Sequence, residues 1–118
     1  MSRRYKHGMN WIRQEKRLAI YIRDSFACIY CRVGIEDDDG IRLALDHVKH
    51  WGGNDASNLV TSCMDCNGRK SCWSLKTFLK RVPHPERVLK RVERALATPI
   101  AELLVQAKEI RKKRREPF

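Results

Sequence analysis

Long apolar runs are missing from this sequence of 118 residues. No stretch approaches the ~20 consecutive apolar residues that a helix needs to cross a bilayer. The chain begins with the basic segment MSRRYKHG, and no apolar segment follows that could form the core of a signal peptide. We therefore expect no membrane association and a cytoplasmic location; a phage-encoded protein acting in the cytoplasm of its host would meet the same expectation.

Acidic residues are few relative to basic ones. The 14 Asp and Glu residues are outnumbered by 25 Lys and Arg residues, which leaves a formal net charge of +11 and a pI near 9.9. Such a surface attracts polyanions, and the clustering of basic residues, as in RKKRR at 111–115, favours nucleic acid over a surface that is merely soluble. We expect DNA as the partner, with RNA left open.

The length favours a single compact domain over 1–118, with a modest core. Periodicity and turn residues predict, in order, a helix capped by Asn10 over 11–24, a strand over 41–48, a turn at 52–55, a short apolar stretch over 59–61 and a helical segment over 67–82 interrupted at 72–74. Beyond Pro85, apolar stripes predict two amphipathic helices within 86–116. These helices could pack on the core of their own chain or form a weak homodimer, so monomer and dimer both stay open.

The five cysteines are the next puzzle, because thiols stay reduced in the cytosol and disulfides are not expected there. Cys28 and Cys31 form one CxxC pair, and Cys63 and Cys66 form another. Two such pairs indicate a tetrahedral zinc site whose four thiolates leave no position for water, so the zinc would be structural. A redox CxxC and unrelated buried cysteines are the alternatives. The segment 32–62 is longer than a zinc ribbon needs, so a further structure must be inserted between the pairs.

The fifth cysteine and the three tryptophans lie outside the two CxxC pairs. We expect Cys72 to be a small buried or interfacial residue. The three tryptophans, Trp11, Trp51 and Trp73, are expected to pack against the protein rather than to insert into DNA, with Trp51 the least settled of them.

Polar residues suited to phosphodiester hydrolysis stand within and just after the insert: Asp46, His47, Asn58, Asn67, Arg69 and Lys70. A histidine can deprotonate water near neutral pH, and a divalent cation can hold the phosphate and stabilise charge on the leaving oxygen. Carboxylate and amide oxygens suit Mg²⁺, while basic side chains hold the flanking backbone. Each residue alone could be polar surface, a turn residue or a helix terminus; together they favour hydrolysis.

The segment CIYC … LALDHVKHWGGNDASNLVTSCMDCNGRK resembles the HNH endonuclease motif of the ββα-metal superfamily, in its form with a four-cysteine zinc site. The shared features are CxxC, Asp-His at a strand end, a loop containing glycine, Asn-Leu, and CxxCN followed by a basic pair. The upstream RDSFACIYC also resembles the segment that leads, in this family, into the first zinc knuckle, which here is the Cys28–Cys31 pair. The resemblance covers 22–72 and leaves out the helices after Pro85.

By position, the resemblance implies a role for four residues. Asp46 would bind the catalytic Mg²⁺ or Mn²⁺, His47 would be the general base, Asn58 would fix the loop and the base, and Asn67 would be the second metal ligand. The fold would be α+β: a ββα-metal finger held by zinc and flanked by an N-terminal helix and C-terminal helices. The products would carry 5′-phosphate and 3′-hydroxyl ends.

We expect Arg69, Lys70, Lys49 and His50 to contact nucleic acid. The segment Lys49-His50-Trp51 departs from the family pattern, in which many relatives have an apolar residue and proline; His50 could contact DNA, compete for metal or simply lie on the surface. The rival hypothesis is a non-catalytic zinc module that binds nucleic acid through its basic surface. The sequence leaves open whether the protein nicks DNA or cuts both strands, and whether it prefers a sequence. It also leaves open whether the role is in phage packaging, homing, restriction or defence.

Overall fold

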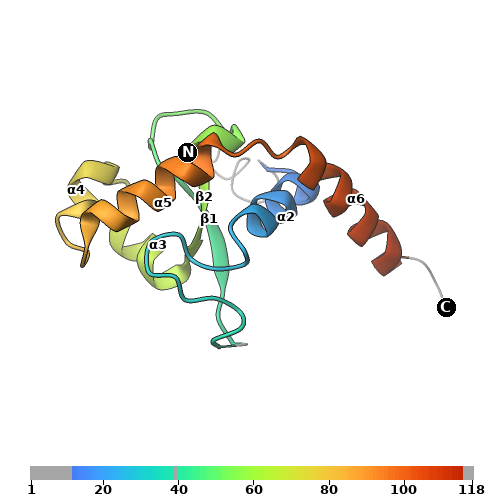
Figure 1. The fold of residues 1–118 in the computed structure, drawn as a ribbon, viewed down its shortest axis with the longest axis horizontal. Helices are drawn as coiled ribbons and strands as arrows, with labels where there is room; N and C mark the ends of the chain where they lie inside the picture. The colour runs from blue at the N-terminus through green and yellow to red at the C-terminus, as the bar shows by residue number, and fades with distance from the viewer. Residues whose placement is uncertain (1–11, 39, 116–118) are drawn as a thin grey trace, which may run out of the picture.

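The computed structural model describes residues 12–38 and 40–115, so the expected cap at Asn10 and the packing of Trp11 lie outside the described residues. The elements in Figure 1 are α2 (Gln14–Arg23), β1 (Leu43–His47), η1 (Ala56–Asn58), β2 (Leu59–Cys63), α3 (Met64–Lys70), α4 (Leu75–Leu79), α5 (Pro85–Ala97) and α6 (Ala101–Arg115). The expected mixture of helix and strand is confirmed. None of the described helices is long and apolar enough to span a membrane.

β1 and β2 form a two-stranded antiparallel sheet that leads directly into α3. The register pairs Leu43 with Cys63 at one end and His47 with Leu59 at the other. β1 is shorter than the expected 41–48 at both ends, whereas β2 continues past the expected apolar stretch to Cys63. Polar residues can continue β2 because its backbone pairs with β1 throughout, and this pairing also satisfies buried backbone groups.

α3 begins at Met64, three residues before the helical segment that the sequence predicts. The cause is a cap that involves a cysteine: the Sγ atom of Cys63 accepts a hydrogen bond from the backbone N–H of Cys66 at 3.4 Å. Ser71, with a φ of 49°, follows the helix, and α4 starts anew behind a Ser74 cap. The expected interruption at 72–74 is therefore confirmed.

Two apolar clusters lie on opposite faces of the sheet, as the alternation of side chains along a strand requires. Leu45 and Leu59 pack with Ile20 of α2 on one face. On the other face, Val60 packs with Phe78 of α4 and with the buried residues of α5, in the same cluster as three of the paired cysteines. Figure 1 shows the resulting arrangement, with α5, α3 and α4 toward one end of the molecule and α2 toward the other.

Both C-terminal helices pack on their own chain. α5 buries Val88 and Val92, and Pro85 at its first turn matches the preference of proline for that position. α6 lies against α2, where Ala107 is fully buried and Arg111 forms an ion pair with Glu15. Intrachain packing, one of the two expected arrangements, is thus observed, and dimerisation stays a prediction.

Candidate functional site

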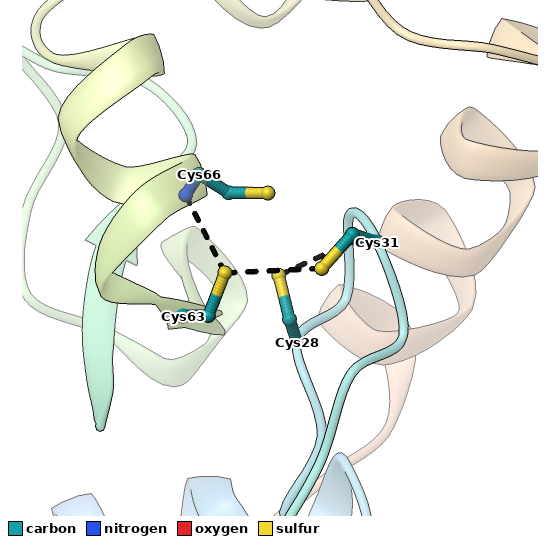
Figure 2. A group of neighbouring side chains, drawn as sticks. All are labelled: Cys28, Cys31, Cys63 and Cys66. Atoms are coloured by element: carbon teal, nitrogen blue, oxygen red, sulfur yellow. Dashed lines mark hydrogen bonds between the residues drawn. The ribbon is translucent and has the colours of Figure 1, made fainter. Parts of the chain in front are cut away.

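The two cysteine pairs converge on one point between the loop before β1 and the start of α3 (Figure 2). The four Sγ atoms lie within 4.8 Å of one another, and those of Cys31 and Cys63 are 3.8 Å apart. A tetrahedral zinc ion with Zn–S bonds of ~2.3 Å has S–S edges of about 3.8 Å. The cluster therefore has dimensions that suit zinc, and its four sulfurs could close the coordination shell.

Backbone N–H groups already point at the sulfurs of both knuckles. The amide of Cys31 donates to the Sγ atom of Cys28 at 3.5 Å, and the amide of Cys66 donates to that of Cys63 at 3.4 Å. Such N–H···S bonds stabilise thiolate charge. Three of the four cysteines are buried, and only Cys31 is exposed.

The pKa values within the cluster show why a cation fits it. A hydrogen bond from the thiol of Cys66 lowers the pKa of Cys28 to about 4, and the same bond raises the pKa of Cys66. Burial raises the pKa of Cys31 to about 11. Cys31 and Cys66 therefore resist ionisation beside the Cys28 thiolate, and a divalent cation would supply the positive charge that further ionisation needs.

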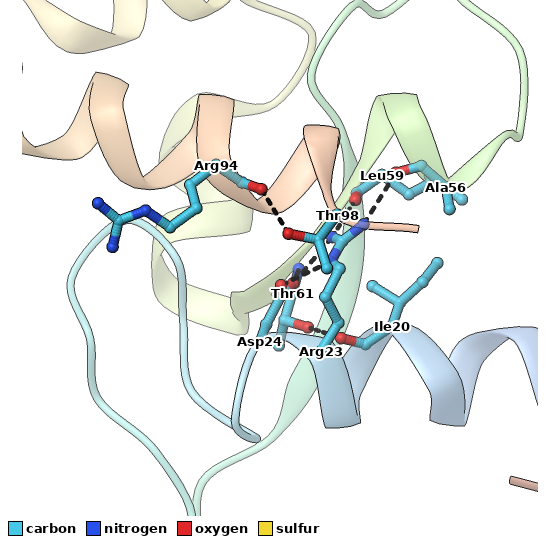
Figure 3. Close-up of polar contacts among 8 residues, drawn as sticks. All are labelled: Ile20, Arg23, Asp24, Ala56, Leu59, Thr61, Arg94 and Thr98. Carbon is cyan, nitrogen blue, oxygen red and sulfur yellow. Dashed lines mark hydrogen bonds and ion pairs between the residues drawn. The ribbon is translucent and has the colours of Figure 1, made fainter. Parts of the chain in front are cut away.

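The entry to the first knuckle is held by a buried ion pair at the end of α2 (Figure 3). The Arg23 guanidinium donates to Asp24 at 2.8 Å and to the backbone oxygens of Ala56 and Leu59, while Asp24 accepts from the amide of Thr61 at 2.8 Å. These bonds tie α2 to the start and middle of β2. The Arg-Asp pair that precedes the first CxxC in the sequence thus has a structural role.

Asp46, near the end of β1, is 5% exposed and lies between two donors. Its Oδ2 atom accepts from the Tyr30 hydroxyl at 2.5 Å and pairs with the Lys70 ammonium at 3.1 Å. Burial and the charge of Asp46 raise the pKa of Tyr30, so its hydroxyl stays protonated and can donate. Tyr30 lies inside the first CxxC and Lys70 ends α3, so Asp46 connects the cysteine cluster to the helix.

The other oxygen of Asp46, Oδ1, accepts no hydrogen bond within the part of the chain that the structure describes. The same part contains no fully buried side-chain N or O atom without a hydrogen-bond partner. Oδ1 is therefore not completely sealed within the protein, although Asp46 as a whole is only 5% exposed. A carboxylate with one oxygen held and the other accessible is suited to binding a cation.

Lys70 corrects an expectation from the sequence. We expected it to reach nucleic acid, but its side chain is fully buried, and its Nζ atom donates to the backbone oxygen of His47 at 2.9 Å as well as pairing with Asp46. The physical reason is that a buried carboxylate needs a partner of opposite charge. Sequence reasoning missed both Tyr30 and Lys70 as partners of Asp46. The spacing of Asn67 and Lys70, one helical turn apart, was the available signal that both lie on one face of α3.

His47 ends β1, is half-buried, and has its Nε2 atom 2.7 Å from Oδ1 of Asn54. Neighbouring residues of a strand point to opposite faces. Asp46 accordingly faces Lys70 and the cysteine cluster, whereas His47 faces the loop that follows the strand. His47, the candidate base, and Asp46, the candidate metal ligand, are thus adjacent in the chain but contact different parts of the protein.

Asn58 holds the loop after β1 in place. This is the first of the two tasks expected for it, which were to fix the loop and to fix the base. Its Oδ1 accepts from the Lys49 amide at 2.8 Å, and its Nδ2 donates to the backbone oxygens of Lys49 and Gly53 at 3.0 and 2.9 Å. Gly52 is needed for this close approach, because a Cβ atom there would lie 2.5 Å from Nδ2 of Asn58.

The remaining expected contacts lie near the surface. Asn67 is half-buried, and its side-chain amide makes no hydrogen bond to any described residue. Arg69 pairs with Asp65 at 3.1 Å across two largely exposed side chains, an arrangement that contributes little to stability. Lys49 and His50 are exposed, as a contact with nucleic acid requires.

Three residues are more exposed than the sequence led us to expect. Trp51 is 91% exposed, so the expectation that it packs against the protein is wrong; its main ring contact is with His50, whose ring centroid lies 4.8 Å away. Trp73 is only partly covered, at 36% exposed. Cys72 is exposed rather than buried, which leaves the interfacial alternative for that thiol.

Comparisons with known proteins add no further identification. No protein-family model matches the chain, and neither a curated protein nor a solved structure matches it. Any functional argument therefore rests on the residues and on the geometry described above.

Proposed function

We propose that this protein is a metal-dependent endonuclease of the HNH type that hydrolyses phosphodiester bonds in DNA. The observation that carries the proposal is the arrangement of Asp46: a strand-end carboxylate beside His47, with Oδ2 held by Tyr30 and Lys70 and Oδ1 bonded to no described residue. A protein that only binds nucleic acid would not need to hold a carboxylate in this way next to a histidine.

The proposed fold class is a ββα-metal finger made of β1, β2 and α3, with a structural zinc ion on Cys28, Cys31, Cys63 and Cys66. The S–S distances and the strand–strand–helix order support it. The zinc site would hold β2, α3 and the first knuckle together, and so fix the distance between Asp46 and the face of α3 that carries Asn67 and Lys70.

His47 is proposed as the general base. Oδ1 of Asn54 accepts a hydrogen bond from Nε2–H and so favours the tautomer in which Nδ1 is the basic nitrogen. His47 would then take a proton from the water that attacks phosphorus. Asn58 would keep the loop, and with it Asn54, in register with the histidine ring.

Asp46 and Asn67 are proposed as the protein ligands of a catalytic Mg²⁺ or Mn²⁺. Both offer hard oxygen atoms, and neither the Oδ1 atom of Asp46 nor the Asn67 amide is occupied by a described residue. When bound, such an ion stabilises charge on the departing 3′ oxygen. The Lys70 ammonium, 3.1 Å from Oδ2, holds the Asp46 carboxylate in position, while Arg69, Lys49 and His50 would contact the flanking backbone.

The test is cleavage of supercoiled plasmid DNA with added Mg²⁺ or Mn²⁺, comparing the parent with His47→Ala. Loss of a general base lowers the rate by ~10²–10⁴-fold, and we expect an effect of that size with DNA binding and folding preserved. Gln106→Ala is the control, because it removes an exposed polar side chain of α6 that has no role in the proposed site. Cleavage by His47→Ala at the parent rate across a metal titration would reject the assignment and favour the non-catalytic binding module.

A further inference from the structure

A groove of about 640 Å³ opens beside the cysteine cluster, between the first knuckle, the end of α3 and the α4–α5 pair. Five arginines contribute to its lining, and no acidic residue does: Arg32, Arg69, Arg81, Arg87 and Arg91. Neither Asp46 nor His47 lines it. The groove therefore adjoins the proposed hydrolytic site, with which it shares Arg69, but it contains neither the candidate base nor the candidate ligands of the catalytic metal.

The positive charge of this groove is only partly neutralised from within the protein. Arg91 donates to the backbone oxygens of Ile29 and Tyr30 at 3.0 and 2.9 Å, which attaches α5 to the first knuckle. Burial, together with the nearby charges of Arg32 and Arg87, lowers the pKa of Arg91. Within the described chain, Arg32 and Arg87 have no ion-pair partner. Two unpaired guanidinium groups at one concave site favour an anionic ligand.

The groove also has an apolar and aromatic part. Phe78 and Val88, each 2% exposed, form part of its floor. At its edge lies the partly exposed ring of Trp73, and the Arg81 guanidinium lies over one face of this ring, 4.8 Å from its centroid, so a base would stack on the opposite face. A tryptophan ring beside an arginine is a common platform for an unpaired base, because every base has a π-face that can stack.

We propose that this groove binds a nucleotide of single-stranded nucleic acid, with its phosphate on Arg32 and Arg87 and its base against Trp73. The combination of cationic and aromatic walls matches the two parts of a nucleotide. A single strand fits better than a duplex, since a paired base shows only its edge and cannot place a ring face against Trp73. The inference deepens the proposed nuclease function, since it would give the DNA strand a second contact away from the hydrolytic site.

The test measures binding without cleavage. A short fluorescent oligothymidylate is titrated with zinc-loaded full-length protein, without added Mg²⁺ or Mn²⁺, and its anisotropy is followed. We expect Arg87→Ala and Trp73→Leu each to weaken binding by about fivefold or more, since a stacked base and a phosphate contact are each worth at least that factor. Lys90→Ala is the matched control: it removes the same charge from an exposed position on α5 outside the groove.

Two outcomes would overturn the proposal. One is that Arg87→Ala and Trp73→Leu, shown by circular dichroism to be folded, bind as tightly as Lys90→Ala. The other is that a duplex of equal length competes as well as the single strand. Failure of the parent to cleave plasmid would instead reject the nuclease function and leave this binding result standing, so the two proposals fail separately.

Discussion

Asp46 connects two segments that are distant from it in the sequence. Its carboxylate is buried between a phenol from the first knuckle and an ammonium from α3, and both of these groups contact the same oxygen, Oδ2. Taking both charges out of water is costly, so the Asp46–Lys70 pair is not a strong source of net stability. Removing one partner is a different matter, because the remaining charge is then buried without compensation.

At the residue scale we therefore predict a large effect of Lys70→Met, a substitution of similar length. The free energy of unfolding of the zinc-loaded protein should fall by about 3–5 kcal/mol, measured by urea denaturation. Arg69→Met, which removes the neighbouring exposed arginine, should change it by only about 0.5 kcal/mol or less. Adding Asp46→Asn to Lys70→Met should recover part of the loss. Equal stability of the two single variants would show that the buried pair has no structural role.

Elements are held together in this protein by side chains that bond to the backbone of a neighbouring segment. Asn58 fastens the loop after β1, Arg23 attaches α2 to β2, and Arg91 attaches α5 to the first knuckle. A two-stranded sheet is marginal by itself in water. Such bonds, with packing on both faces, keep β1 and its loop in one arrangement.

The loop between β1 and η1 offers the test at the element scale. Asn58→Ala removes three hydrogen bonds, each worth about 1 kcal/mol, so local opening of the loop should become at least about tenfold more frequent. Hydrogen exchange should speed up at the Lys49 amide while the core of α5 stays protected. Ser57→Ala, at the exposed neighbouring position, is the control. Unchanged exchange at Lys49 in Asn58→Ala would contradict this account of the loop.

The whole molecule has two modest apolar clusters separated by the sheet, and three of the four paired cysteines belong to the larger one. A zinc ion there would connect the first knuckle with the start of α3, two segments far apart in the sequence. Metal binding of this kind contributes directly to the free energy of folding. Without it, the first knuckle would be joined to the start of α3 only by the packing of the larger cluster and by the bonds of Tyr30.

For the whole molecule we predict about one tightly bound zinc ion per chain, found by metal analysis of purified protein. Chelation or Cys63→Ser should cause loss of tertiary structure, which near-UV circular dichroism measures. The midpoint of thermal unfolding should fall as well. Cys72→Ser should retain both the zinc and the parent midpoint, because Cys72 is exposed and lies outside the cluster. A zinc-free protein with the full tertiary signal would refute the prediction.

Features that depend on local spacing could be predicted from the sequence. Each CxxC pair brings two sulfur atoms together within a few residues. Only the approach of the two pairs to each other had to be inferred. The helix after Pro85 combines a proline at its first turn with an apolar stripe, and both signals are local. The mixed fold and the interruption before α4 follow in the same way, since capping and turn preferences are properties of short segments.

Only the tertiary structure decided which way the ambiguous side chains point. Lys70 and Arg69 are both basic residues at the end of one helix, yet one is fully buried and the other largely exposed. The difference arises because the packing of α3 on β1 brings Lys70 to Asp46, a residue distant in the sequence. Trp51 was expected inside and lies outside, because the loop after β1 is fastened by Asn58 rather than by apolar packing. Burial of this kind depends on contacts between distant segments, which the pattern within each segment does not encode.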